Sequence, residues 1–347
     1  MAVESSETIS TSPRLKDVAE AAGVSISTAS RVLSGARGAS REAAAAVLAA
    51  SERLNYRPDP IARALRAQTT GLVGMVVPSI GNPFFAEVVE AVENALQKRG
   101  LEMIVADSGG DTAHEARRLT LLAQRKVDGL LVVPTHRAES APALRRMREV
   151  PVVLVDRQVD GISGDYVGVD NAIGITLVLD HLEQQGYRSL VFVSDTATSS
   201  TGRSRLETFE LLVSRRPAFR ARPPRLGSFS VEFGRDVVRA LLAEGELPDA
   251  VVCGSDIIAL GVVRELHRAG IDVPHDIGVT GFDGISFAEL CDPPLTTIRQ
   301  PLPAIAEEAV RLLAARMAHS AVAAHRSEVA PLLEIRASSL RQQNVNR

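Results

Sequence analysis

The 347-residue sequence has few cysteines and no long apolar run, and each absence excludes a class of protein. Its two cysteines, Cys253 and Cys291, lack the spacing of metal ligands, which argues against a structural zinc site and a disulfide scaffold. No stretch approaches the roughly 18 apolar residues that a membrane span needs. The N-terminal segment lacks the apolar core of a secretory signal. We therefore expect a cytoplasmic protein with no metal site and no membrane partner.

Common sequence motifs of enzymes are absent as well. There is no GxxxxGK[ST] phosphate loop, no HExxH zinc motif and no GxSxG nucleophile turn, and the seven histidines are scattered. These absences predict a protein that is not an enzyme and that uses no cofactor. An enzyme that processes sugars or nucleosides remains an alternative, and turnover of such a substrate by the purified protein would support it.

The charge of the chain is unevenly distributed. Residues 14–66 contain nine Lys and Arg against five Asp and Glu, a balance of +4, although the whole chain carries a net charge of −3. The remainder must therefore sum to −7. A basic head on an acidic body is consistent with an anionic polymer as partner.

Two short helices are predicted in this basic region, after a polar tail over residues 1–13 that we expect to be disordered. In the first, Leu15, Val18 and nearby alanines recur at helical spacing until Gly23. In the second, over Ser25–Leu33, one apolar face is directed inward and Ile26, Ser27, Ser30 and Arg31 point away. Two helices joined through a glycine turn are typical of a helix-turn-helix, which reads the major groove of DNA.

A third helix is predicted from about Ser40 to Leu54, with Ser40 as its N-cap and Val47 and Ala50 facing the other two helices. Three such helices close a small core. A helical hairpin in the cap of an enzyme is the alternative interpretation of this region.

The run LKDVAEAAGVSISTASRVLS at 15–34, followed by LNYRP at 54–58, closely resembles the lac repressor family of bacterial regulators. The resemblance implies a helix-turn-helix domain over 14–57 that binds operator DNA. Ile26 and Ser27 stand at the two positions that usually select the operator. Ala43 and Ala44 replace the usual Thr-Arg pair, so that Arg41 is the substitute for a phosphate contact. The implied DNA-binding residues are Leu15, Ser25, Ile26, Ser27, Thr28, Ser30, Arg31, Ser34, Tyr56, Ile61 and Leu65.

Residues 58–70 predict a hinge. Asp59 is a natural N-cap and Pro60 suits the first helical position, so that a helix of one to two turns is encoded. Because nucleation makes so short a helix marginal, we expect it to form only when paired with its dimer mate on DNA. By the resemblance, Leu65 is the side chain inserted into the minor groove, flanked by Arg63 and Arg66 at phosphates. An ordinary linker is the alternative.

From Gly71 onward, apolar β-rich runs alternate with helical stretches. This pattern predicts an α/β fold with parallel sheets in two lobes. Ligands of such sheets bind at the carboxyl ends of the strands, so the polar residues after each run are expected to converge on one cleft. The predicted strands are Leu72–Val77, Met103–Ala106, Gly129–Val133, Val152–Val155, Ser189–Val193, Ala250–Cys253 and Ile277–Gly281, and the polar residues are Ser79, Asn82, Asp107, Asp156, Arg157, Ser194, Asp195, Ser255, Asp256 and Asp283.

The body also resembles the family's effector domain, which is similar to periplasmic sugar-binding proteins. The marks include GNPFFAEVV at 81–89, PVVLVDR at 151–157 and GFD at 281–283. The chain departs from the family at Ser255, where Asn is usual, and at Thr208, where Gly is usual, so the ligand of no known member can be transferred. The implied effector-binding residues are Phe84, Asp156, Arg157, Thr201, Arg205, Phe229, Ser255 and Asp283.

The expected core spans 71–341, with one lobe over about 71–170 plus 298–326 and the other over about 171–297 plus 327–341. The C-terminal segment lacks the heptads of a coiled coil, which predicts a homodimer on a near-palindromic operator. The resemblance implies a transcriptional repressor controlled by a small molecule, in the first place a carbohydrate. A transport-type solute-binding protein with the same two-lobed body is the alternative.

Overall fold

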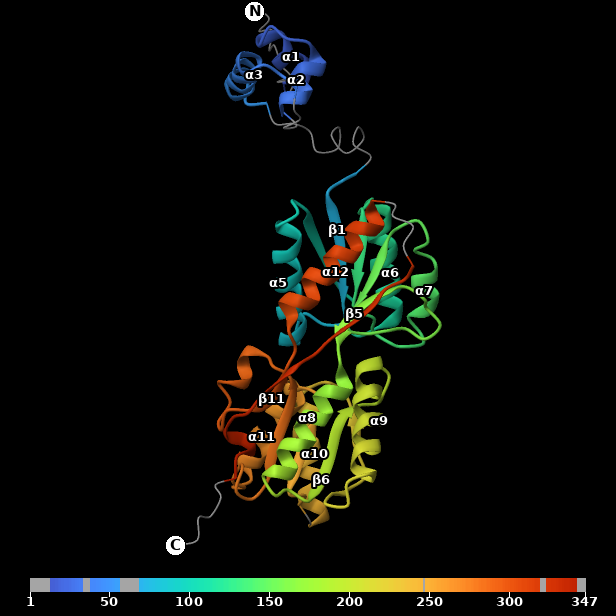
Figure 1. The fold of residues 1–347 in the computed structure, drawn as a ribbon, viewed down its shortest axis with the longest axis vertical. Helices are drawn as coiled ribbons and strands as arrows, with labels where there is room; N and C mark the ends of the chain where they lie inside the picture. Colours follow the sequence, from blue (N-terminus) through green and yellow to red (C-terminus); the bar gives the residue numbers. More distant parts are fainter. Residues whose placement is uncertain (1–12, 34–37, 57–68, 246, 319–322, 342–347) are drawn as a thin grey trace, which may run out of the picture. The chain divides into compact units, whose positions relative to one another are not determined.

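The structure is a computed structural model that describes residues 13–33, 38–56, 69–245, 247–318 and 323–341. The chain divides into two compact units, Met1–Thr70 and Gly71–Arg347, which are described separately below. We call them the head and the core. Figure 1 shows the elements of both.

The head contains three helices around a small apolar centre. Val18 and Ala19 of the first helix, Ala29 of the second and Val47 and Ala50 of the third are buried together. Gly23 has a φ of +65° at the turn after the first helix, a conformation that favours glycine. The sequence predicted all three helices. They are α1 (Leu15–Ala21), α2 (Ile26–Leu33) and α3 (Arg41–Arg53).

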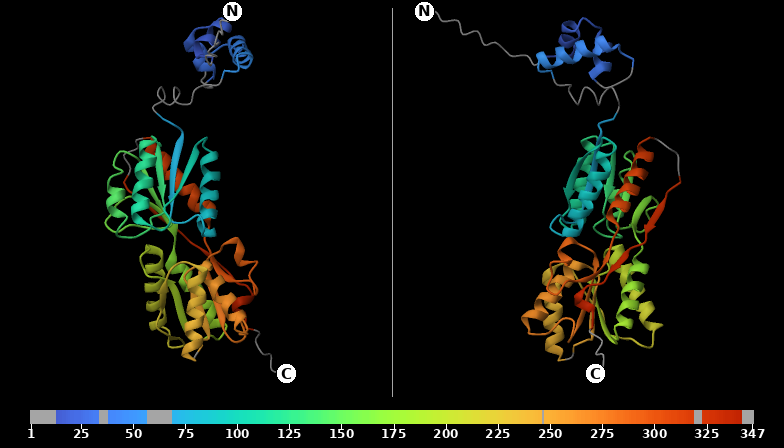
Figure 2. Two further views of the ribbon diagram at one scale, coloured as in Figure 1. Left: turned by 180° about the vertical axis from the view of Figure 1, so that it is seen from behind. Right: turned by 60° about the vertical axis from the view of Figure 1, so that its left-hand side comes forward.

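The core consists of two lobes, each built on a mainly parallel sheet between helices, as the alternating pattern predicted (Figures 1 and 2). In the N-lobe the strand order is β12-β5-β4-β3-β1-β2, with α5 and α12 packed together on one face and α6 and α7 on the other. The elements of this lobe are β1 (Leu72–Val77), α5 (Pro83–Gln97), β2 (Glu102–Asp107), α6 (Thr112–Gln124), β3 (Gly129–Val132), α7 (Ala141–Arg145), β4 (Val152–Val155), β5 (Asp165–Val169), α12 (Leu302–Met317) and β12 (Arg326–Val329).

In the C-lobe the strand order is β13-β11-β10-β9-β6-β7, and β8 also pairs with β6. Helix α8 packs against α9, and α10 packs against α11. The elements of this lobe are α8 (Asn171–Gln184), β6 (Ser189–Asp195), α9 (Ser200–Ser214), β7 (Arg220–Ala221), β8 (Arg225–Gly227), α10 (Val231–Glu244), β9 (Ala250–Cys253), α11 (Asp256–Arg268), β10 (Gly278–Asp283), the 3-10 turns η1 (Ser286–Ala288) and η2 (Ala337–Ser339), β11 (Thr296–Arg299) and β13 (Leu332–Glu334).

The chain crosses between the lobes after β5, after β11 and between β12 and β13. At two places the strand pairing puts the boundary between the lobes a few residues away from its expected position. Ser327–Val329 pair with Val167–Val169 and so belong to the N-lobe, three residues past the expected end at 326. Ile298 and Arg299 pair with β10 and stay in the C-lobe. These short strands lack the long apolar runs from which the other strands were predicted.

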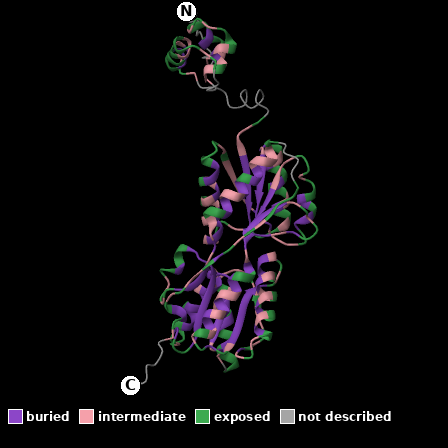
Figure 3. Cartoon of the chain, viewed as in Figure 1, coloured by how far each residue is buried: buried purple, intermediate pink, exposed green. Residues whose placement is uncertain are grey.

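Buried residues concentrate in the strands of both sheets (Figure 3). Val76 and Val132 in the N-lobe and Val191 and Val252 in the C-lobe are fully buried, as expected for strands covered on both faces. The rigid sheets hold the carboxyl ends of their strands toward the space between the lobes. Within the described ranges, no helix combines the length and apolarity needed to cross a membrane.

Candidate functional site

The second helix of the head presents a polar face opposite its buried side. Ala29 is buried in the centre of the head, whereas Ser25, Ile26, Ser27 and Arg31 are exposed. The exposed fraction of Ile26 is 46%, which is high for an isoleucine on a short helix. An apolar side chain among hydroxyl groups suits contact with a thymine methyl group in the major groove.

Ser25 fixes the beginning of this helix. Its Oγ accepts a hydrogen bond from the backbone N–H of Thr28 at 3.1 Å, and it lies 2.9 Å from the Thr28 hydroxyl and 2.8 Å from the Ser27 hydroxyl. Since an N-cap orients the first turn, Ser25 positions Ile26 and Ser27. Ser40 caps α3 in the same way, accepting from Ala43.

The remaining predicted DNA contacts fall into two groups. Leu15, Thr28, Ser30 and Tyr56 are half-buried in the head, and the apolar parts of Leu15 and Tyr56 pack against its centre. Ser34, Ile61 and Leu65 lie outside the described residues, as does most of the predicted hinge.

A narrow pocket lies between the lobes of the core, and all eight predicted effector residues line it. It is formed from both lobes, with only about 10 Å³ of free space between the side chains, room for about one water molecule. Two further lining residues, Asn82 and Phe85, stand in the segment after the first strand that was expected at the cleft, although neither was among the residues selected as effector contacts. The lining residues are Asn82, Phe84, Phe85, Asp156, Arg157, Thr201, Arg205, Phe229, Ser255 and Asp283.

Arg205 is the most firmly held side chain of the pocket. It is 2% exposed, its Nε donates to Oδ1 of Asn171 at 2.7 Å, and its Nη1 donates to the carbonyl of Gly254 at 2.7 Å. Nη1 also lies 3.4 Å from Oδ1 of Asp283, and the guanidinium carbon is 3.6 Å from the centre of the Phe282 ring. This fixed orientation leaves further N–H donors for hydrogen bonds to a ligand.

Asp156 and Arg157 enter the pocket from the N-lobe, directly after β4. The backbone of Asp156 has a φ of +62°, a conformation that is uncommon for a residue other than glycine. Burial raises the pKa of Asp156 above its ordinary value, against the opposing effect of Arg157 and Arg205. Burial likewise lowers the pKa of Arg157, against the effect of Asp156. A pocket that holds such costly charges is typical of a functional site.

Asp283 faces them from the C-lobe at the end of β10. Its Oδ1 accepts from Nε2 of Gln300 at 2.9 Å. Burial raises its pKa well above the ordinary value, although Arg205 lowers it. Sequence reasoning missed Gln300, because the short strand β11 that precedes it was not among the predicted strands.

Other polar residues at strand ends do not line the pocket, contrary to the expected convergence. Asp107 accepts from the backbone of Ile80 and Gly109, and Asp195 accepts from the backbone of Ser199 at 3.1 Å and from its hydroxyl at 2.7 Å. Ser79 and Ser194 are also not among the lining residues. Unpaired loop N–H groups are costly, and the two carboxylates satisfy them.

Asp256 supports the pocket from behind. Its Oδ1 accepts from the hydroxyl of Thr297 at 2.5 Å and its Oδ2 from the backbone N–H of Ile285 at 2.9 Å. Burial raises the pKa of Asp256 to about 7, although both hydrogen bonds lower it. The side chain therefore ties the beginning of α11 to the loop after β10, and so places Ser255 and Asp283.

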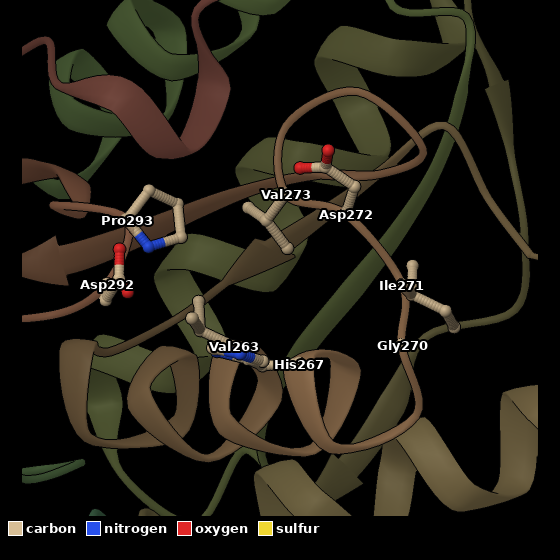
Figure 4. Close-up of a pocket in the computed structure, with 8 residues that line it drawn as sticks. All are labelled: Val263, His267, Gly270, Ile271, Asp272, Val273, Asp292 and Pro293. Carbon is tan, nitrogen blue, oxygen red and sulfur yellow. The ribbon is translucent and has the colours of Figure 1, made fainter.

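A larger hollow of about 330 Å³ lies at the other end of α11 (Figure 4). Val263 and His267 line it from the helix, and Asp272, Val273 and Asp292 line it from two loops. None of the predicted effector residues lines this hollow. Among the described residues, no three His, Cys, Asp or Glu side chains form a group that could hold a metal ion. We therefore take the pocket between the lobes, where charged side chains gather, as the candidate site.

Comparison with known proteins agrees with both parts of this geometry. Residues 14–59 match the model of bacterial regulatory proteins of the lacI family, and residues 179–339 match the periplasmic binding protein-like domain. The ribose operon repressor of Escherichia coli (strain K12) is 34% identical over 328 residues, which cover 94% of this chain and 99% of that protein. This chain belongs to the LacI family. It is thus a DNA-binding transcription regulator, and its helix-turn-helix and two-lobed fold are confirmed.

Other LacI-family proteins match over similar lengths. The HTH-type transcriptional repressor PurR of Mannheimia succiniciproducens is 34% identical over 327 residues, which cover 93% of this chain and 98% of that protein. A crystal structure of the Lac repressor dimer bound to operator and the anti-inducer ONPF matches with a TM-score of 0.86 at 25% identity, covering 95% of this chain and all of that one. A complex of the transcriptional regulator CelR with cellobiose matches with a TM-score of 0.71 at 29% identity, covering 94% and 99% of the two chains.

Proposed function

We propose that this LacI-family protein is a transcriptional repressor that binds a near-palindromic operator as a homodimer and is controlled by a small carbohydrate effector. The relatives named above are repressors, and the similar CelR structure holds cellobiose. The observation that carries the proposal is the exposed face of α2, on which Ile26 and Ser27 lie opposite the buried Ala29.

The contacts to DNA follow from that face. Ser25, Ile26, Ser27, Thr28, Ser30 and Arg31 read or grip the operator, and Leu15, Ser34 and Tyr56 contact its backbone. Ile61 and Leu65 act from the hinge at 58–70, where Leu65 is inserted between bases of the minor groove. Effector binding changes the angle between the lobes and with it the pairing of the two hinges. By linkage, an effector that weakens operator binding binds the DNA-bound protein less well by the same factor.

The pocket between the lobes is the effector site of the proposal. Phe84 and Phe229 supply aromatic faces on which a ring can stack, and the buried carboxylate and guanidinium groups of Asp156, Arg205 and Asp283 can hydrogen-bond hydroxyl groups bidentately. Arg157 lines the same site beside them. Thr201 and Ser255 add hydroxyl groups of their own. The same chemistry would suit a nucleoside, which a binding screen distinguishes.

The dimer is supported by apolar side chains on one side of the C-lobe. Leu290 is 80% exposed and Leu332 is 66% exposed, and Ile335 is also exposed. Arg336, which follows Ile335, links its segment to the one that contains Leu290, because its Nη2 donates to Oε1 of Glu289 at 3.0 Å. We call Leu290, Leu332 and Ile335 the C-lobe apolar patch. Such a cluster costs free energy in water and suits burial against a second copy.

The proposal includes a cytoplasmic location and no catalysis. The α2 face has no use in an exported solute-binding protein. The sequence has no GxxxxGK[ST] phosphate loop, and no metal-ligand cluster lies among the residues that the structure describes. Turnover of a sugar by the purified protein would contradict this part of the proposal.

The test is sequence-selective DNA binding. Selection from random duplexes should enrich a near-palindromic site, and Arg31→Ala and Ile26→Ala should each weaken binding to it, Ile26→Ala by about 1–3 kcal/mol if it contacts a base. The control is Arg117→Ala, which makes the same change of charge on the exposed surface of α6. No enrichment, or equal binding by all three variants, would refute the proposal.

A further inference from the structure

Arg157 reaches from one lobe to the other and contacts an aromatic ring on each side. Its guanidinium carbon lies 5.2 Å from the ring centre of Phe85 in α5 and 5.7 Å from that of Phe229, which precedes α10. Both distances are within the roughly 6 Å of a cation–π contact. The carboxylates of Asp195 and Asp283 in the C-lobe also attract it. The planar guanidinium thus takes up the aromatic surface on which a flat ligand would stack.

The hydrogen bonds of Arg157 are poor for so buried a cation. The residue is 7% exposed, and its Nη1 lies 3.4 Å from the carbonyl of Pro134. Its Nε is 3.7 Å from Oδ2 of Asp156 and makes no hydrogen bond with any residue that the structure describes. Buried donors are normally satisfied, so this side chain is not held in place as Arg205 is.

Three acceptor atoms around the pocket are also unsatisfied. Oδ1 of Asp156, Oε1 of Gln300 and Oγ of Ser255 are buried without a hydrogen-bond partner within the described part of the chain. The carboxylate and amide oxygens need donors, and the serine hydroxyl can use either kind of partner. A phosphate or carboxylate group offers mainly acceptors, whereas sugar hydroxyls offer both. The unsatisfied atoms therefore favour an uncharged ligand that is rich in hydroxyl groups.

The lobes are already closed around this arrangement. The backbone N–H of Gln158 donates to Oγ of Ser200 at 2.8 Å, and that of Ser286 donates to Oε1 of Glu87 at 2.8 Å, each across the gap between the lobes. With about 10 Å³ of free space, a sugar ring cannot enter while Arg157 stays where it is.

We propose that Arg157 is a built-in occupant of the effector site, and that the effector is a neutral, hydroxyl-rich ring that displaces its guanidinium from Phe85 and Phe229. The inference rests on the proposed function, since it concerns the same site. In this arrangement Arg157 competes with the effector, which lowers the apparent affinity by the fraction of molecules in which the position is free.

The first test needs no knowledge of the effector. Arg157→Ala in the full chain should leave a slot that methylguanidinium fills, so that millimolar methylguanidinium chloride raises the melting temperature of this variant in a saturable way and not that of the wild type. Equal concentrations of sodium chloride control for ionic strength. Arg203→Ala is the matched control, since Arg203 is an exposed arginine whose Nε pairs with Glu207 on the surface of α9. Saturable stabilisation of Arg157→Ala alone supports the proposal, and no stabilisation refutes it.

The second test compares matched probes by calorimetry, D-ribose with ribose 5-phosphate and D-glucose with glucose 6-phosphate. At least one neutral sugar should bind Arg157→Ala about tenfold more tightly than the wild type, as expected where the occupant fills the slot in about nine molecules of ten. Methylguanidinium should compete with it. Weaker sugar binding by the variant would show that Arg157 is a ligand contact, and tighter binding of the phosphorylated probes would overturn the ligand class.

A second, milder variant keeps the proposal testable where Arg157→Ala fails to fold. Arg157→Lys keeps the positive charge beside Asp156 but loses the planar group, and sugar affinity should rise by a smaller factor than in Arg157→Ala. If methylguanidinium fills the slot but no probe binds either protein, the neutral-sugar class is wrong while the occupant is established. Failure to enrich an operator, or an Arg31→Ala variant that binds the operator as tightly as the wild type, is a separate result, which would refute the proposed function alone.

Discussion

At the scale of single residues, the site depends on how each buried charge is paired. Arg205 has Asn171 and Gly254 as close partners, and Asp256 has Thr297 and Ile285. Arg157 has no comparable set. Well-paired side chains define the shape of the pocket, whereas a poorly paired one is free to exchange its partners for those of a ligand.

Asp256 makes stability depend on pH in a direction that can be measured. Its pKa is about 7 in the folded protein and near 3.8 when unfolded, so the folded state binds more protons between these values. Stability from this residue is therefore present at low pH and lost as pH rises toward 7 and above. We expect the stability of Asp256→Asn relative to the wild type, measured by urea unfolding, to rise between pH 4 and pH 7, and the variant to exceed the wild type at pH 8.

The comparison of the two proteins cancels the other carboxyl groups, whose shifts run in both directions. Asn can still accept from Ile285 and can donate to Thr297. An Asp256→Asn variant that is less stable than the wild type at pH 8 would contradict the shifted pKa.

Sequence reasoning reached many of these residues but not their pairing. Arg205 and Asp283 were identified from a family motif, and the structure places both in the pocket. The contact of Arg205 with Asn171 joins two residues that are 34 positions apart, one in α9 and the other in α8. That contact depends on how α8 and α9 pack, which local spacing does not specify.

At the scale of elements, α10 and α11 approach each other through glycine. A Cβ atom added at Gly234 would lie 2.2 Å from the backbone oxygen of Ile258, and one added at Gly261 would lie 2.1 Å from that of Val231. Backbone atoms within two helices cannot give way locally. This pairing fixes α11, whose first turn borders the effector site.

We expect Gly234→Ala to lower the free energy of unfolding by about 1–3 kcal/mol, because the helices must separate to admit the methyl group. Urea unfolding followed by circular dichroism measures the change. Gly164→Ala is the control, since its added Cβ would meet only Ile162 at 3.9 Å. Equal stability of the two variants would show that the helices adjust without cost.

The elements were predicted unevenly. Long apolar strands such as Leu72–Val77 were found with their bounds, because burial on both faces leaves a continuous apolar run. Strand β12, with the sequence RSEV, pairs with β5 on one side only and has no such run. An edge strand of this kind is selected by its partner, so the lobe boundary was placed too early.

At the scale of the whole molecule, the C-lobe apolar patch connects dimerisation to DNA binding. Operator half-sites are read by two heads, so loss of the dimer removes half of the contacts. We expect Leu290→Glu to shift the protein toward a monomer in light scattering after size exclusion, and to weaken operator binding at a fixed protein concentration.

The control for this change is Leu121→Glu, which places the same charge at a 41% exposed leucine on α6. It should leave both mass and operator binding unchanged. If Leu290→Glu remains a dimer, another surface joins the two copies and the patch has a different use.

The threading of the N-lobe sheet has a consequence for synthesis. Its edge strand β12 and its covering helix α12, with buried Ile305, Ala309 and Val310, come after nearly the whole C-lobe in the chain. A nascent chain that has emerged only as far as Gly284 therefore carries β3, β4 and β5 with one apolar face uncovered. During translation this lobe stays incomplete and prone to bind chaperones until α12 and β12 have emerged from the ribosome, although its first strand emerges long before.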